Sequence, residues 1–433
     1  MDIKTPKKVY FLGIGGIGMS ALAKLFAHEG NMVVGADTGF ADLEGLKRAK
    51  IEVFEGYDES RVDTSIGALV YTLATTDDNV ELLKARELNI PIFTYGEMLG
   101  IVSKEKNTIA VCGTHGKTTT TAMLAKMLID ANQMPSVIVG SLMTDPKNPQ
   151  NKTNYIAGVS DLFVVEACEY KKSFLNLWPK IICITNIDAD HLDFYGTLPN
   201  VILAFKEFIG KLPEDGVVIA DLTDPNSKKA VEGAKVKIIN SNDFYDPQMK
   251  LNVFGDHNRK NASIGLALAN HFGISADIAS SALESFSGTW RRFEYKGKTE
   301  NGAIVYDDYG HHPHEILATL KGAREGFADK KLTIVFEPHL YSRTKEHFND
   351  FVDVLSKFDF IYLTEIYGAR ETFDPTITSS MLALKIKEKN PNVVVEASYE
   401  KIAEALKKDA GEKDVIVTMG AGNITKLSDM LIL

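Results

Sequence analysis

Two glycine-rich loops, each placed between an apolar run and a helix-like stretch, limit the folds that this chain can adopt. Residues 13–18 read Gly-Ile-Gly-Gly-Ile-Gly after the apolar run 9–12, and residues 113–118 read Gly-Thr-His-Gly-Lys-Thr after the run 108–112. Such loops are typical of parallel α/β sheets that bind nucleotides, because the N-terminus of the following helix directs amide groups at phosphates. The sequence therefore predicts α/β domains with a nucleotide site at each loop.

Short apolar runs alternate with helical patterns along the whole chain, which is typical of parallel sheets with crossover helices. A polar stretch at 103–107 and a Ser-Gly break at 287–288 divide the alternation into three segments. We predict three α/β domains in series: a Rossmann-like domain (1–104), a central P-loop ATPase-type domain (105–288) and a C-terminal Rossmann-like domain (289–433). The predicted strands are residues 9–12, 32–36, 68–71, 90–93, 108–112, 162–165, 181–184, 216–219, 303–306, 332–336, 360–363, 393–395 and 415–418.

Composition excludes several classes of protein. A chain of 433 residues, 45% of them hydrophobic, is long enough for two or three cores. The 48 Lys+Arg and 58 Asp+Glu residues give a net charge of -10, which argues against nucleic-acid binding. Three cysteines without a Cys-x-x-Cys pair indicate neither a disulfide framework nor a cysteine-built zinc site. No apolar run reaches the roughly 18 residues of a membrane span, and residues 1–8 lack a signal-peptide core, so we expect a cytoplasmic protein.

The first loop matches the pattern Gly-x-Gly-x-x-Gly. Its glycines would let the backbone approach a diphosphate, and Asp37, which closes the following strand, would bind a ribose hydroxyl. A tight turn without a ligand is the alternative interpretation. The residues predicted to hold the nucleotide diphosphate are Gly15, Gly16, Ile17 and Gly18.

The second loop keeps the main features of a phosphate-binding P-loop, although Val111 stands where that pattern has its first glycine. Lys117 would reach the β- and γ-phosphates of ATP, and Thr118 would bind Mg²⁺. We therefore predict ATP and Mg²⁺ as ligands of this loop. Its other predicted ATP-binding residues are Gly113, Thr114, His115, Gly116 and Thr119.

Carboxylates and a histidine follow two predicted strands of the central segment. Glu166 ends one strand, and Asp188, Asp190 and His191 follow the next. Both groups should lie at the carboxyl edge of the sheet, where α/β proteins bind ligands. Mg²⁺ prefers one or two carboxylates, so Glu166 suits it better than a histidine does. Helix caps and polar loop groups are the alternative interpretation for each of these residues.

Two loops of the third segment are rich in His, Tyr, Asp and Arg. Residues 307–313 read Asp-Asp-Tyr-Gly-His-His-Pro, and residues 338–344 read Pro-His-Leu-Tyr-Ser-Arg-Thr. Because both follow strands, we expect them to form one wall of a cleft. A helix N-cap is the alternative role for Asp308 and His311. Residues 420–423, Gly-Ala-Gly-Asn, are more simply a connection from strand to helix.

With these motifs the chain resembles the Mur ligase family, and the alanine-adding branch of that family in particular. The resemblance implies ATP-dependent ligation of L-alanine to the carboxylate of UDP-N-acetylmuramate through an acyl phosphate, a step of peptidoglycan precursor synthesis. It extends over essentially the whole chain. The matching stretches are residues 13–20, 113–121, 165–175, 185–191, 257–258, 261, 291–293, 307–313, 336–344 and 420–424.

The resemblance also implies roles for individual residues. Residues 15–18, with Asp37 and His115, would bind the UDP-sugar. The implied ATP contacts outside the P-loop are Asn258, Asn261, Arg292 and Asp308. The implied metal ligands are Thr118, Glu166 and His191. The implied catalytic residues are Lys117, Glu166, His191 and Arg292. The implied amino-acid pocket consists of Tyr309, His311, His339 and Arg343.

The chain departs from the family pattern at a few positions. Residues 166–170 read Glu-Ala-Cys-Glu-Tyr instead of the acid-rich Glu-Ala-Asp-Glu-Ser, which leaves the role of Glu169 open. Phe254 replaces a proline, and Asn423 replaces an aspartate. We locate no counterpart of the carbamylated lysine that many Mur ligases use.

Other functions explain less of the sequence. A murein-recycling ligase, which adds a tripeptide to the same UDP-sugar, is the main alternative, but its loops differ from 307–313 and 338–344. An NAD-dependent dehydrogenase would explain only the first loop, and folylpolyglutamate synthase lacks the first domain. A non-catalytic nucleotide-binding protein is a further alternative, but Lys117, Glu166, His191 and Arg292 are all present. We expect UDP-N-acetylmuramate and L-alanine as partners, no nucleic acid, no membrane, and a monomer or homodimer.

Overall fold

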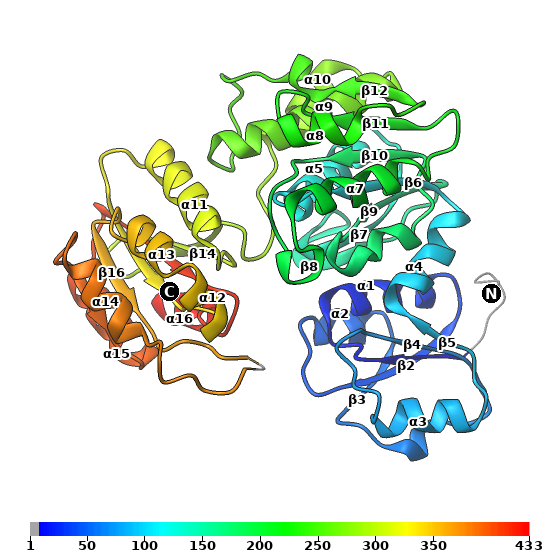
Figure 1. Cartoon of the computed structure of the whole chain (residues 1–433), viewed down its shortest axis with the longest axis horizontal. Helices are drawn as coiled ribbons and strands as arrows, with labels where there is room; N and C mark the ends of the chain where they lie inside the picture. Colours follow the sequence, from blue (N-terminus) through cyan, green and yellow to red (C-terminus); the bar gives the residue numbers. More distant parts are fainter. Residues whose placement is uncertain (1–7, 370, 433) are drawn as a thin grey trace. The chain divides into compact units, whose positions relative to one another are not determined.

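The computed structural model describes residues 8–369 and 371–432. The prediction that no signal peptide is present concerned residues 1–8, and residues 1–7 lie outside the described residues. Within the described ranges, no helix combines the length and the apolar character needed to cross a bilayer. Three sheets follow one another along the chain, from blue through green to red in Figure 1. This is the three-sheet α/β organisation that the sequence predicts, whereas the boundaries at 104 and 288 stay predictions.

The described residues form two compact units. The first contains the described chain up to Leu251 together with Asn258–Phe286, and the second contains Asn252–His257 and the described chain from Ser287. The first two sheets belong to the first unit, and apolar residues from both contribute to one continuous core. The third sheet belongs to the second unit.

The first sheet has five parallel strands in the order β3-β2-β1-β4-β5. β1 is apolar from Val9 to Leu12 because both of its faces are covered: Val9 and Phe11 belong to one core, and Tyr10 and Leu12 to another. β1 lies between β2 and β4, so the first glycine loop leaves the sheet where the strand order reverses. The elements are β1 (Lys8–Leu12), α1 (Ile17–His28), β2 (Met32–Asp37), α2 (Leu43–Arg48), β3 (Glu52–Glu55), η1 (Glu59–Arg61), β4 (Ile66–Tyr71), α3 (Val80–Glu87), β5 (Ile92–Thr94) and α4 (Tyr95–Lys104).

The second sheet has seven strands in the order β12-β11-β10-β6-β9-β7-β8, and β8 alone runs antiparallel to its neighbour. β6 lies between β10 and β9, which places the second glycine loop at another reversal of strand order. The elements are β6 (Asn107–Cys112), α5 (Lys117–Asp130), β7 (Ser136–Asp145), β8 (Asn148–Ile156), β9 (Leu162–Glu166), η2 (Tyr170–Asn176), β10 (Ile181–Ile184), α6 (Leu192–Tyr195), α7 (Leu198–Ile209), β11 (Val217–Ala220), α8 (Pro225–Val231), β12 (Lys237–Asn240), η3 (Ser241–Phe244), α9 (Asp256–Phe272) and α10 (Ala276–Glu284).

The β7–β8 hairpin was not predicted from the sequence. β8 reads Asn-Pro-Gln-Asn-Lys-Thr-Asn-Tyr-Ile, which lacks the apolar alternation of a strand because much of it lies at an exposed sheet edge. The short edge strands β3, β12 and β13 were missed for the same reason. Pairing in the hairpin is interrupted: Ile138 pairs with Tyr155 and Met143 with Thr153. The residues between Ile138 and Met143 therefore form a bulge opposite Asn154.

The third sheet has six strands in the order β13-β14-β18-β15-β16-β17, with β13 antiparallel to β14. Val305 and Val335 pack with α15 and α16 on one face, and Tyr306 and Phe336 pack with α11, α13 and α14 on the other. β14, β18 and β15 are parallel neighbours, so the loops that follow them meet at one edge. The elements are β13 (Glu294–Lys298), β14 (Ile304–Asp308), α11 (Pro313–Gly326), β15 (Lys331–Phe336), α12 (Tyr341–Glu346), α13 (Phe348–Leu355), β16 (Phe360–Leu363), α14 (Ser379–Lys387), β17 (Val393–Val395), α15 (Tyr399–Asp409), β18 (Asp414–Met419) and α16 (Thr425–Leu431).

Candidate active site

The first glycine loop joins β1 to α1 and packs closely against the segment that follows β2. Gly15 donates its amide to Oδ2 of Asp37 at 2.9 Å, and its carbonyl accepts from the amide of Ala41 at 2.9 Å. A Cβ on Gly15 would overlap the carbonyl oxygen of Gly39, so only glycine fits there. Gly16 precedes α1 without a side-chain capping bond. The start of this helix is therefore open to an anion such as a diphosphate.

A cavity of about 120 Å³ lies between the end of the first glycine loop and the second sheet. Gly18 in α1 and Tyr95 in α4 line it on one side, and Gly140 and Glu166 in the second sheet line it on the other. A Cβ on Gly18 would lie 3.0 Å from the hydroxyl oxygen of Tyr95, so the loop approaches this ring closely. Burial, reinforced by the charge of Glu166, raises the pKa of Tyr95 and keeps its hydroxyl protonated. The cavity thus lies between the first glycine loop and the predicted metal ligand Glu166, within one unit.

Lys117 is the first residue of α5, and the loop before it holds its ammonium group. Nζ donates to the carbonyl of Gly113 at 2.6 Å, to the carbonyl of Thr114 at 3.0 Å and to Oε1 of Glu169 at 2.9 Å. Burial alone would lower the pKa of Lys117, but the attraction of Glu169 and of other nearby acidic groups raises it. The ammonium is therefore charged at neutral pH, at the position where a P-loop receives phosphates.

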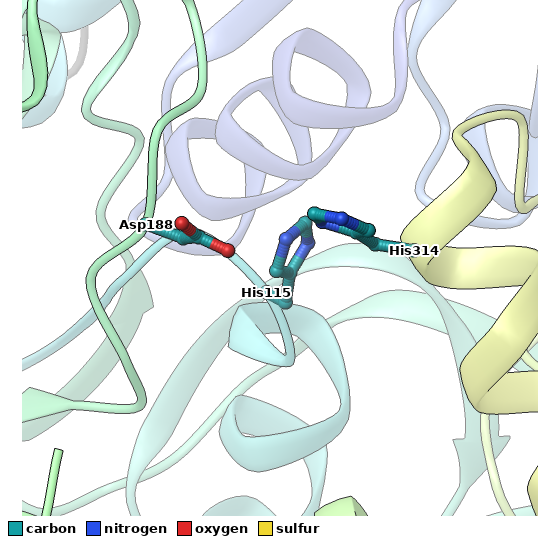
Figure 2. A group of neighbouring side chains, drawn as sticks. All are labelled: His115, Asp188 and His314. Carbon is teal, nitrogen blue, oxygen red and sulfur yellow. The ribbon is translucent and has the colours of Figure 1, made fainter. Parts of the chain in front are cut away.

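Polar residues after β10 hold the second glycine loop in shape. The carbonyl of His115 accepts from Oγ1 of Thr185 at 2.6 Å and from Nδ2 of Asn186 at 2.8 Å. The amide of His115 donates to Oδ1 of Asn186 at 3.0 Å. Figure 2 shows His115 on the loop before α5 and Asp188 on the loop after β10; it also labels His314, which lies on α11 in the second unit. These bonds preorganise the loop.

Asn258 and Asn261, two of the implied ATP contacts, lie in the first turns of α9 and are 8% and 5% exposed. Nδ2 of Asn261 donates to Oδ1 of Asn258 at 3.3 Å. Asn261 also lies against the P-loop, since a Cβ on Gly116 would be 2.8 Å from its Oδ1. Gly116 has a φ of 85°, so both its backbone and its surroundings require glycine. α9 thus places two amide side chains beside the phosphate-binding loop.

Thr118 and Glu166 bring two oxygen ligands together near the N-terminus of α5. Oγ1 of Thr118 donates to Oε1 of Glu166 at 3.1 Å. His191 groups instead with Glu169 and Asp190, because its Nε2 lies 3.8 Å from a carboxylate oxygen of each. The structure therefore brings together two of the three predicted metal ligands. A hydroxyl and a carboxylate beside a phosphate loop are the donor set that Mg²⁺ prefers.

Arg292 lies between two residues with a left-handed backbone, in the second unit. Arg291 has a φ of 55° and Phe293 a φ of 47°. Arg291 is buried, and the guanidinium groups of Arg291 and Arg292 both lie over the ring of Tyr309, 5.0 and 5.6 Å from its centroid. The segment therefore places two arginines beside the loop after β14.

The four residues predicted to form the amino-acid pocket lie together at the carboxyl edge of the third sheet. The ring centroids of Tyr309 and His311 are 5.6 Å apart, and those of His311 and His339 are 5.8 Å apart. Nη1 of Arg343 lies 3.1 Å from Nδ1 of His339, which must therefore accept the bond. Burial, with the nearby His311 and Arg343, lowers the pKa of His339 to about 4. The group thus combines one permanent cation with a neutral imidazole.

Comparisons with known proteins agree along the whole chain. Residues 8–107 match the Mur ligase family catalytic domain, residues 111–246 the Mur ligase middle domain, and residues 291–422 the Mur ligase glutamate ligase domain. The chain is 39% identical to a UDP-N-acetylmuramate--L-alanine ligase of Clostridium botulinum, with 98% of this chain and 97% of the relative covered. It is 36% identical to the protein of the same name from Agathobacter rectalis, with 100% and 99% covered. The chain belongs to the Mur ligase family.

Solved structures agree with this assignment. The crystal structure of the UDP-N-acetylmuramate-alanine ligase MurC from Thermotoga maritima matches with a TM-score of 0.83 and 27% identity, and 98% of each chain is covered. A murein peptide ligase from Psychrobacter arcticus matches with a TM-score of 0.69 and 23% identity, again over 98% of each chain. The second likeness shows a shared fold alone.

Two carboxylates of this Mur ligase that were predicted to contact a nucleotide, Asp37 and Asp308, already accept hydrogen bonds within the fold. Oδ1 of Asp37 accepts from the amide of Thr38 at 2.7 Å, and Oδ2 accepts from the first glycine loop. Asp308 accepts from the amides of Phe293 at 2.9 Å and Gly310 at 2.7 Å. Burial raises the pKa of Asp308 to about 6. The N-cap of α11 is His312, so neither Asp308 nor His311 has that alternative role.

Sequence reasoning missed the residues that hold the Gly-Ala-Gly-Asn turn after β18 in this Mur ligase. The guanidinium of Arg291 donates to the carbonyls of Gly420 and Gly422, the latter at 3.0 Å, and its Nε lies 3.2 Å from Asp307. Glu337, which is 4% exposed, accepts from Tyr399 and from the amide of Ile424, the latter at 3.3 Å. For Glu337, the signal available in the sequence was a charged residue placed directly after an apolar strand. Thr185 and Asn186 gave a weaker form of this signal, because they are polar residues directly after β10.

Proposed function

We propose that this Mur ligase joins L-alanine to the carboxylate of UDP-N-acetylmuramate, with conversion of ATP to ADP and phosphate. The observation that carries the proposal is the full-length identity of 36–39% to proteins named for this reaction. The geometry supports it, because Lys117 begins α5 at a phosphate loop and a separate glycine loop begins α1. The reaction would supply the first amino acid of a peptidoglycan precursor.

The chemistry requires no protein nucleophile. A carboxylate oxygen of the UDP-sugar attacks the γ-phosphorus of ATP, ADP leaves, and an acyl phosphate forms. The neutral amine of alanine then attacks the acyl carbon, the bond from that carbon to the phosphate oxygen breaks, and the nitrogen loses a proton. Negative charge gathers on the phosphoryl oxygens in the first step. Lys117 would stabilise this charge by exchanging Glu169 for the phosphates, and Arg292 is the further cation proposed for this role.

Thr118 and Glu166 are the residues that we propose to hold Mg²⁺, with His191 as a further ligand. The side-chain oxygen atoms of Thr118 and Glu166 already lie together beside the phosphate loop, which fits the preference of Mg²⁺ for oxygen ligands. The ion supplies neutralisation of phosphate charge when it is bound. Titration with Mn²⁺, followed by electron paramagnetic resonance, should show weaker binding of the ion by Glu166→Gln. Unchanged Mn²⁺ affinity would remove Glu166 from the metal site.

The second unit suits recognition of a small amino acid. Arg343 offers a planar pair of donors that matches a carboxylate, and it would hold alanine while the amine attacks. A purely structural Arg343 would be expected to form an ion pair with Glu346. Among the described residues no Arg343–Glu346 ion pair is found, and the guanidinium of Arg343 contacts His339 instead. Tyr309 and His311, whose rings lie close together, would complete a small pocket that favours a short side chain.

The proposed substrates also suggest where the protein works. ATP and UDP-sugars are cytoplasmic metabolites, so we propose a cytoplasmic enzyme that acts as a monomer or homodimer. None of the three proposed substrates is a nucleic acid or a lipid surface.

The decisive experiment measures ADP release with UDP-N-acetylmuramate and a panel of nucleophiles. L-Alanine should support the fastest release, with glycine and serine slower and bulky amino acids inactive. The tripeptide L-alanyl-γ-D-glutamyl-meso-diaminopimelate tests the murein-recycling alternative, because preference for it over L-alanine would overturn the proposal. ADP should not be released rapidly when any one of the three substrates is omitted.

A further inference from the structure

A buried asparagine of the central domain is bonded directly to the first glycine loop. Asn154 lies on β8 and is 0% exposed. Its Nδ2 donates to the carbonyl of Ile17 at 2.6 Å and to Oγ of Ser20 at 2.8 Å. Ile17 belongs to the stretch proposed to bind the diphosphate, and it is the first residue of α1. The side chain of Asn154, on the second sheet, thus fixes the start of α1, which follows β1 of the first sheet.

The amide oxygen of Asn154 is linked, through Lys24, to the segment after β2 that contacts the first glycine loop. Nζ of Lys24, one turn further along α1, donates to Oδ1 of Asn154 at 2.7 Å and forms a buried ion pair with Asp42. Burial lowers the pKa of Lys24, while Asp42 opposes that change. The neighbour of Asp42, Ala41, donates its amide to the carbonyl of Gly15. The glycine loop, α1 and the segment after β2 are therefore joined through one side chain.

The hairpin that carries Asn154 is itself anchored at the candidate metal site. Asn154 lies opposite the bulge in β7, and Gly140 belongs to that bulge. The amide of Gly140 donates to Oε2 of Glu166 at 2.9 Å, and a Cβ on Gly140 would overlap the Glu166 carboxylate. One side of the hairpin therefore contacts the proposed Mg²⁺ ligand, and the other contacts the proposed UDP-sugar loop.

We propose that Asn154 is a positioning residue for the UDP-sugar: it sets the direction of the first amides of α1 from the central domain. This inference rests on the proposed role of the first glycine loop. The amide of Asn154 serves as donor and acceptor at once, which a carboxylate of the same shape does not do. An aspartate would still accept from Lys24, but it would face the carbonyl oxygen of Ile17 with a second acceptor.

The test compares Asn154→Asp with Asn148→Asp. The two variants carry the same chemical change on the same strand, but Asn148 is exposed. Calorimetry on the full chain would measure the Kd for UDP-N-acetylmuramate and, separately, for ADP with Mg²⁺, and thermal melting would report stability. Loss of one buried donor bond should raise the Kd for UDP-N-acetylmuramate about tenfold or more in Asn154→Asp. The Kd for ADP should stay unchanged, and Asn148→Asp should match the wild type in both.

A second, milder variant keeps the test informative if Asn154→Asp folds poorly. Ser20→Ala removes one of the two groups that receive a bond from Asn154, and it should raise the Kd for UDP-N-acetylmuramate by a smaller factor. A lowered melting temperature with an unchanged Kd for the UDP-sugar in both variants would overturn the inference, since it indicates a packing role only. A parallel rise in both Kd values would overturn it too. Wild-type protein that does not bind UDP-N-acetylmuramate at all would instead refute the proposed function.

Discussion

Replacing Lys117 separates its proposed role in catalysis from its role in the fold. Its ammonium forms a largely buried pair with Glu169, whose side chain is 3% exposed, and Oε2 of that carboxylate has no hydrogen-bond partner among the described residues. In Lys117→Met this carboxylate is left buried without its cation. Breaking a buried pair from one side costs about 3–5 kcal/mol, so the melting temperature should fall by roughly 10 °C.

The effect on turnover has a different origin. Removing one preorganised charge contact to the transferring phosphoryl group costs about 3–4 kcal/mol, which is roughly two to three decades in kcat at saturating ATP. The double variant Lys117→Met with Glu169→Gln removes the unpaired charge. It should therefore recover most of the lost stability, and its kcat should stay as low as that of Lys117→Met.

Thermal melting and steady-state ADP release of the three variants, Glu169→Gln included, supply the comparison. Glu169→Gln alone keeps the Lys117 ammonium and controls for any separate role of the carboxylate. Recovery of kcat together with stability in the double variant would refute the reasoning, because Lys117 would then act through the fold and not on phosphate. Near-normal kcat in Lys117→Met would refute it as well.

Three further predictions follow from other parts of the site. Gly15→Val should weaken binding of UDP-N-acetylmuramate and leave ADP binding intact in calorimetry, because a Cβ there overlaps the carbonyl of Gly39; the reverse pattern would assign this loop to ATP. Arg343→Lys should raise the KM for alanine steeply without changing the KM for the UDP-sugar, and a folded variant with an unchanged alanine KM would remove Arg343 from the pocket. His339 has a pKa of about 4 in the fold against 6.5 as its ordinary value, so the unfolded chain takes up the proton first as the pH falls. Its stabilising contribution is present above pH 6.5 and is lost towards pH 4. Urea unfolding should show that the free energy of unfolding falls less between pH 6.5 and pH 4 for His339→Gln than for the wild type. An equal fall in both proteins would contradict the lowered pKa of His339.

The fold was predictable where local patterns are strong. Every predicted strand but one overlaps an observed strand closely, because central parallel strands are apolar on both faces and end in glycine or polar loops. The predicted strand 90–93 instead begins at Ile92, after Pro91, which has no amide hydrogen to pair. Edge strands such as β8 carry polar residues and give no such pattern. Their pairing depends on contacts far away in the sequence.

The candidate site was predictable as a set of loops and less so as a set of contacts. The sequence places Thr118 after one strand and Glu166 at the end of another; the structure pairs these two strands and joins the two side chains. His191 follows the next strand, but a left-handed backbone with a φ of 53° turns it towards Glu169. Asn154 was invisible to motif reasoning, because its partners lie more than a hundred residues earlier and its strand has no apolar pattern. Such long-range bonds are decided by how the two sheets pack in one unit.

The most direct measurement follows an oxygen atom from the UDP-sugar to phosphate. UDP-N-acetylmuramate labelled with ¹⁸O in its carboxylate would be incubated with the protein, ATP, Mg²⁺ and L-alanine, and the released phosphate would be analysed by mass spectrometry. Activation through an acyl phosphate predicts one labelled oxygen in each phosphate and a new amide to alanine in the sugar product. Unlabelled phosphate, or phosphate release without the alanine amide, would contradict the account.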